Sequence, residues 1–221
     1  MKPSIDLDRL LTEAPAPNAD AMARVLAAAR GELALKRPVR RWRTQAAWLV
    51  AASAGLGLLA AVVMFAMGAV SGPLLLARAP LLTLLVGTSA VCAWGALTPG
   101  GTGLRRLGVG LAVVSAAAVV LARGTPHAAP TLPGWVCTVS HLAIGAVPLV
   151  VALFALRGTV FQPLRAAVAG LSVGSTGALL GELACEQDGR HVIAHHLLAW
   201  AVITVVLVVI SKSLKPRSYA P

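Results

Sequence analysis

Six long apolar segments follow one another along this chain of 221 residues, and short polar stretches separate them. Each segment is close to the ~20 residues that an α-helix needs to cross about 30 Å of hydrocarbon. Most of them have no polar face, whereas soluble core helices would show one. The pattern predicts an all-α, polytopic membrane protein whose six transmembrane helices lie at about residues 46–70, 79–98, 107–122, 137–156, 164–185 and 193–211.

The first 45 residues are more polar and form a separate segment. A short helix capped by Ser4 is predicted first, and the stretch APAPN, residues 14–18, ends it. A second helix is predicted from about Asp20 to Leu35, because apolar residues recur there at helical spacing. The apolar stripe consists of Met22, Val25, Leu26, Ala29 and Leu33.

A segment of this length buries too little apolar surface to form a stable core alone. We therefore expect the apolar stripe either to bind a partner or to lie on the lipid bilayer. The predicted organisation is a cytoplasmic partner-binding segment at 1–45, a six-helix transmembrane domain at 46–211 and a cytoplasmic tail at 212–221.

The net charge of +11 arises from lysines and arginines that flank the apolar segments. Aromatic residues make up only 4% of the chain and the cations do not follow one helix, so direct nucleic-acid binding is not expected. By the positive-inside rule, both termini face the cytoplasm of the cell whose membrane the chain crosses several times. The outer side carries only Arg78, Arg123 and Arg190, and the inner side carries Lys36, Arg37, Arg40, Arg41, Arg43, Arg105, Arg106, Arg157, Arg165, Lys212, Lys215 and Arg217.

Four glycines in the fifth apolar segment follow one another at spacings of four, three and four residues. These spacings place Gly170, Gly174, Gly177 and Gly181 on one ridge of a helix. Small residues at such positions let another transmembrane helix approach closely. The ridge predicts tight helix packing along this segment.

Polar side chains gather where the fourth segment begins, the fifth ends and the sixth begins. Three helices should bring them to one depth near the outer face, in pairs that share a helical face. The candidate sensing or metal-binding residues are Cys137, His141, Glu182, Cys185, His191 and His195. His196 follows His195 by about 100° of rotation in an α-helix, so it is expected to point away. Polar groups near hydrocarbon are costly unless they are paired, and a chance gathering is therefore improbable.

Four interpretations of these residues stay open. They could bind a metal ion such as zinc, since thiolates and imidazoles suit soft to borderline metals. Cys137 and Cys185 could instead form a redox pair in an oxidising compartment. Two histidines could hold a haem, or the side chains could be capping and interfacial groups without any ligand. The HVIAHH stretch resembles a histidine box of membrane di-iron desaturases, but the sequence has no second box and this interpretation is rejected.

Several motifs together resemble a known family. Cys137 opens the fourth segment, Leu156-Arg157 is followed by Pro163-Leu164-Arg165, and the fifth segment reads GLSVGSTGALLGELAC, residues 170–185. With the histidines that open the sixth segment and the amphipathic segment before the first, this arrangement resembles the polytopic membrane anti-sigma factors of the NrsF type. The likeness lies mostly within residues 130–210.

The resemblance implies a regulator and not an enzyme. Its partner would be an extracytoplasmic-function sigma factor, which such proteins hold at the membrane and release on light, singlet-oxygen or other stress. In that family the paired outer cysteines are implicated in sensing. The rival interpretation is a small membrane transporter or a metal or haem redox protein, but such a protein needs ionisable groups near the middle of the membrane. The charged residues and histidines of the apolar segments, Glu182 among them, lie near the segment ends and not at the middle. The sequence does not indicate an oligomeric state.

Overall fold

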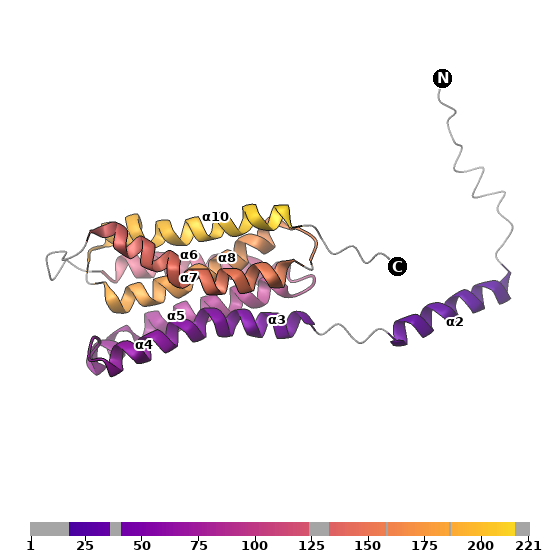
Figure 1. Cartoon of the computed structure of the whole chain (residues 1–221), viewed down its shortest axis with the longest axis horizontal. Coiled ribbons are helices and arrows are strands. Elements are labelled where there is room, and N and C mark those ends of the chain that lie inside the picture. The colour runs from indigo at the N-terminus through magenta and orange to yellow at the C-terminus, as the bar shows by residue number, and fades with distance from the viewer. Residues whose placement is uncertain (1–17, 36–40, 124–132, 158, 186, 215–221) are drawn as a thin grey trace, which may run out of the picture. The chain divides into compact units, whose positions relative to one another are not determined.

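The computed structural model describes residues 18–35, 41–123, 133–157, 159–185 and 187–214, and every regular element within these ranges is a helix (Figure 1). The chain divides into two compact units, residues 1–40 and 41–221. The predicted short helix that begins at Ser4 lies outside the described residues.

The first unit contains helix α2, Ala19–Leu35, which confirms the predicted amphipathic helix. The Asn18 side chain begins it by accepting a hydrogen bond from the Asp20 backbone N–H at 3.0 Å. Met22, Val25 and Leu26 are 45%, 64% and 47% exposed, and Ala29 is exposed as well. The side chain of Leu33 lies outside the described residues.

The second unit is a bundle of antiparallel helices (Figure 1). Six helices in its described residues are long and apolar enough to cross a membrane, which confirms the predicted fold class. The first of them starts at Trp42 and not at 46, because the helix continues through the polar residues that precede the apolar run. The elements are α3 (Arg41–Val50), η1 (Ala51–Gly55), α4 (Leu56–Ala66), α5 (Gly72–Leu97), α6 (Thr102–Leu121), α7 (Gly134–Leu156), α8 (Pro163–Ala184), α9 (Gly189–His191), η2 (Val192–Leu197) and α10 (Leu198–Ser213).

Helix α8 lies at the centre of the bundle. In its most apolar stretch 89% of the residues are buried, whereas the corresponding share in the other five spans is 17% to 33%. It packs against α4, α5, α6, α7 and α10. Its Ser and Thr side chains form hydrogen bonds inside the bundle. For example, Ser172 Oγ donates to the Ser89 carbonyl at 2.9 Å. The other spans turn large apolar side chains outward, as expected for lipid-facing surfaces.

The glycine ridge of α8 is where its neighbours approach most closely. A Cβ on Gly170 would lie 2.6 Å from Thr204 Cα of α10, and a Cβ on Gly174 would collide with the Trp200 ring. Trp200 fills the space that Gly174 leaves and donates from Nε1 to the Leu171 carbonyl at 2.9 Å. The predicted close packing is therefore confirmed.

Replacing Gly174 with alanine should destabilise the bundle, because the added methyl group overlaps the Trp200 ring. Overpacking of this kind costs about 1–3 kcal/mol, which corresponds to roughly 2–12 °C in Tm for a chain of this size. Thermal unfolding in detergent measures the change. Gly110→Ala is the matched control, because no atom lies within 4 Å of the position its Cβ would take. Equal melting temperatures for the two variants would contradict the packing argument.

Candidate functional site

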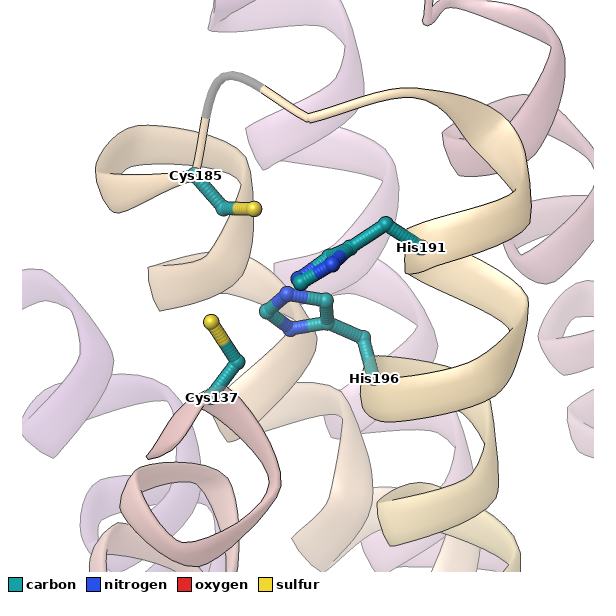
Figure 2. A group of neighbouring side chains, drawn as sticks. All are labelled: Cys137, Cys185, His191 and His196. Carbon is teal, nitrogen blue, oxygen red and sulfur yellow. The ribbon is translucent and has the colours of Figure 1, made fainter. Parts of the chain in front are cut away.

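Two cysteines and two histidines lie together at the end of the bundle where α7 begins and α8 ends. The α9–η2 turn that leads into α10 lies at the same end. Cys137 lies in the first turn of α7, Cys185 is the C-cap residue of α8, and His191 and His196 lie in the α9–η2 turn. One possible ligand atom from each side chain lies within 4.8 Å of all the others. Figure 2 shows both thiols and both rings directed toward a common centre. We call these four residues the cysteine–histidine cluster.

The histidine pairing differs from the expected one, and a π-helix is the reason. An α-helix would place His191 and His195 on one face, as the sequence analysis assumed. Residues Val192–Leu197 form a π-helix, whose backbone hydrogen bonds join residues five apart and whose wider turn brings such residues closer to one face than an α-helix does. His191 and His196 therefore share a face, and the expectation that His196 points away is wrong. His196 is only 6% exposed.

His195 turns away from the two thiols. Its Nδ1 atom lies 3.2 Å from Thr138 Oγ1, and its ring fills the space beside Gly134 of α7. The ring stays close to that of His191, with 4.6 Å between the two ring centroids. His195 therefore connects η2 to the start of α7. It lies next to the cysteine–histidine cluster but is not one of its four residues.

His141 lies one turn deeper than Cys137 on α7 and is 2% exposed. Its Nε2 atom is 3.0 Å from the Gly174 carbonyl oxygen, and its ring fills the space that Gly177 leaves on α8. The His141 and His196 ring centroids are 6.0 Å apart. His141 therefore forms the floor beneath the cysteine–histidine cluster and is not one of its four residues.

Glu182 belongs to an ion-pair network and not to the cysteine–histidine cluster. Its fully buried carboxylate pairs with Arg123 at 2.9 Å and with Arg78 at 3.3 Å. Arg123 also donates to the carbonyls of Gly181, at 3.0 Å, and of Cys185. These carbonyls lie in the last turn of α8, where a helix cannot satisfy them itself. Arg123 therefore fixes the backbone that carries Cys185.

The chain aligns without interruption with one characterised protein. It is 82% identical to the carotenogenesis protein CarR of Myxococcus xanthus over 221 residues, which is the full length of both chains. The chain belongs to the CarR family. The motifs of the fourth to sixth apolar segments point to CarR, and this identity confirms that resemblance. No family model and no solved structure matches the chain.

Three residues of this CarR-family chain that support the site were not among the predicted site residues: Arg78, Arg123 and Asp188. The Asp188 side chain accepts a hydrogen bond from the His191 backbone N–H at 2.9 Å and so starts the helix that aims His191. A sequence signal existed for each. Aspartate is a preferred N-cap residue, and a carboxylate near hydrocarbon needs a cationic partner, for which the few outer arginines were the candidates.

The two thiols and two imidazoles of the cysteine–histidine cluster determine which reactions and ligands are possible there. Both cysteines are free thiols. Thiolates and imidazoles together bind soft and borderline metal ions, and two neighbouring thiols can also be oxidised to a disulfide. Cys92, by contrast, is fully buried and its thiol donates to the Gly108 carbonyl at 3.4 Å, which suits an inert core residue.

Proposed function

We propose that this chain is a membrane anti-sigma factor. Its N-terminal segment sequesters an extracytoplasmic-function sigma factor at the bacterial inner membrane, and light, singlet-oxygen or other stress causes its release. As a member of the CarR family, the chain thereby acts as a negative regulator of carotenoid genes and not as an enzyme. The observation that carries this proposal is the exposed apolar stripe of α2 in a unit separate from the membrane bundle.

The apolar stripe resembles the face by which an amphipathic helix binds in an apolar groove of a partner protein. Met22, Val25 and Leu26 are large apolar residues spaced three and four apart, and about half or more of each side chain is exposed. Spacing of this kind is typical of helical ligands that dock an apolar face into a partner. Burying each side chain contributes about 1.5–3 kcal/mol. Three such residues supply enough free energy to hold a protein partner.

Charge supports the assignment of the two ends of the bundle to opposite sides of the membrane. The cysteine–histidine cluster lies where α7 begins, and the cation-rich sequence around Arg41 and Arg43 lies where α3 begins, at the other end of the bundle (Figure 1). By the positive-inside rule, the partner-binding segment faces the cytoplasm and the cysteine–histidine cluster faces outward. This arrangement suits a protein that detects a stimulus outside and binds its partner inside.

The helices of the cysteine–histidine cluster offer a route between the two ends. Cys137 starts α7, Cys185 ends α8 and His196 leads into α10, and these three helices pack on one another along the bundle. A chemical change that alters the distances between the four side chains would shift the ends of all three helices. Coupling between distant sites is typically worth about 1–3 kcal/mol. We propose that this coupling weakens the hold on the sigma factor.

Co-purification tests the proposed function. The full chain, tagged at its C-terminus, is expressed with each extracytoplasmic-function sigma factor of the same genome in turn and purified in mild detergent. We expect an equimolar complex with one of them that blocks transcription by core RNA polymerase from that sigma factor's promoter. Absence of all of them from the purified protein, together with unaltered transcription, would refute the proposal.

A further inference from the structure

We propose that the cysteine–histidine cluster is a four-coordinate metal site and that Zn²⁺ is the ion it takes. The site would hold the start of α7, the end of α8 and the π-turn before α10 together. This inference goes beyond the proposed function, because it concerns the ligand of the cluster and holds whether or not a sigma factor binds the other end.

The ligand types match zinc in number and in kind. Structural zinc sites use four cysteine or histidine ligands, and two of each is a common set. Two thiolates and two neutral imidazoles also give a Zn²⁺ complex of zero net charge. A neutral complex is the form that a buried site near hydrocarbon tolerates best, because an uncompensated charge is strongly disfavoured there.

The spacing of the four side chains is close to that of a tetrahedral site. Zn–S bonds of about 2.3 Å and Zn–N bonds of about 2.0–2.1 Å place neighbouring ligand atoms roughly 3.3–3.8 Å apart. The four side chains already bring their ligand atoms within 4.8 Å of one another. An inward movement of about one ångström completes the tetrahedron. Cys137 and Cys185 lie at helix ends, where a movement of this size is easily accommodated.

The imidazole nitrogens give a second, independent indication of a ligand. Neither ring nitrogen of His196, which is 6% exposed, has a hydrogen-bond partner within the described ranges, and neither does Nε2 of His191. Buried polar atoms are nearly always partnered in folded proteins. Coordination would satisfy one nitrogen of each ring. In Figure 2 both rings lie on the same side of the two thiols and face them, as ligands of one ion would.

The π-turn supports the same conclusion. Single π-turns within helices are uncommon and often occur at functional sites. Here the turn places His191 and His196 on the face that looks toward Cys137 and Cys185. His195 stays beside His191, with 4.6 Å between the ring centroids, but only His191 and His196 bring a ring nitrogen close to both thiols. The irregular turn therefore adds His196 to the set.

The nearby ionisable groups have other partners, which limits the set to four. Glu182 is held by Arg78 and Arg123, so its carboxylate is already occupied by ion pairs. His195 contacts Thr138, and His141 contacts the Gly174 carbonyl. Four protein ligands close the coordination shell, as in structural zinc sites, whereas catalytic sites keep a position open.

Metal analysis of the full chain tests this site. The protein is purified in detergent with a non-thiol reductant, stripped with a chelator and titrated with Zn²⁺ or Co²⁺. We expect one equivalent of metal per chain, and Co²⁺ should give intense d–d bands of a tetrahedral complex together with a thiolate charge-transfer band. Cys137→Ser, Cys185→Ser and His196→Gln should each abolish this spectrum. The titration does not involve the sigma factor, so failure of the metal site and failure of the proposed function are distinguishable.

Two matched controls and one rescue variant make the assignment specific. His195→Gln removes the neighbouring imidazole of the same turn, and Cys92→Ser removes the buried thiol elsewhere in the bundle, so both should keep the full Co²⁺ spectrum. Cys185→His keeps a ligand at the site. It should retain Co²⁺ with a weaker thiolate charge-transfer band, and this measurement applies even if Cys185→Ser fails to fold.

Four outcomes would overturn the metal site. The reduced wild-type protein could take up neither ion, or His195→Gln could lose as much metal as His196→Gln. Mass spectrometry could show a Cys137–Cys185 disulfide whose reduction does not permit metal uptake. A Soret band in the purified protein would assign the histidines to a haem instead. A disulfide whose reduction restores metal uptake would support the proposal.

Discussion

Replacing Leu26 with aspartate is expected to weaken capture of the sigma factor at least a hundredfold. Leu26 lies in the middle of the exposed stripe of α2, so its burial against a partner contributes about 1.5–3 kcal/mol. The carboxylate that replaces it must also be desolvated in an apolar groove, which costs several kcal/mol more. A loss above about 2.7 kcal/mol corresponds to a hundredfold change in Kd.

Titration of the detergent-solubilised protein with a fluorescently labelled sigma factor measures this effect. Ala27→Asp is the matched control, because it adds the same charge one residue later, about 100° around the helix and away from Met22 and Val25. We expect the control to bind within a few-fold of the wild type. Equal weakening by both variants would show that added negative charge, and not loss of the apolar stripe, controls capture.

Replacing Glu182 with leucine is expected to destabilise the membrane bundle by about 3–5 kcal/mol, the typical cost of removing one partner from a buried ion pair. The carboxylate is fully buried, and Arg123 beside it is only 4% exposed, so the arginine charge would be left without compensation. Arg123 would then also lose the group that orients it toward the Cys185 carbonyl. We therefore expect lower metal affinity as well as a lower Tm.

Thermal unfolding in detergent, with and without Zn²⁺, measures both consequences. Arg106→Met, which changes an exposed charge in α6, should leave Tm nearly unchanged. A triple variant with methionine at Arg78 and Arg123 and leucine at Glu182 should recover much of the lost stability, because replacing a whole buried charge network with apolar groups is often neutral. A wild-type Tm for Glu182→Leu alone would show that the network contributes nothing.

The fold could be predicted because its signals are local. Apolar runs long enough to span a membrane predicted the six spans, and the glycine spacing predicted where neighbours approach α8. The start of the first span was misjudged, because the residues from Arg41 to Gln45 are polar apart from Trp42 and yet continue the helix. Residues 41–45 needed tertiary context to be assigned.

The site could be predicted only in part, because two of its determinants are not local. Cys137, Cys185 and His191 followed from their places at helix ends. The exchange of His195 for His196 depends on a π-turn, and the apolar pattern of η2 does not distinguish this turn from an α-helix. The partners of Glu182 are 59 and 104 residues away in the sequence, beyond the reach of any helical periodicity.

The central place of α8 has a consequence for how the protein is made. A helix rich in Gly, Ser and Thr gains little from lipid contact, so its stable insertion depends on neighbours that are already in the bilayer. One of those neighbours, α10, is synthesised after α8. Stable insertion of α8 therefore waits until α10 has been made, and chains that terminate before α10 leave the least lipid-compatible helix exposed to membrane proteases.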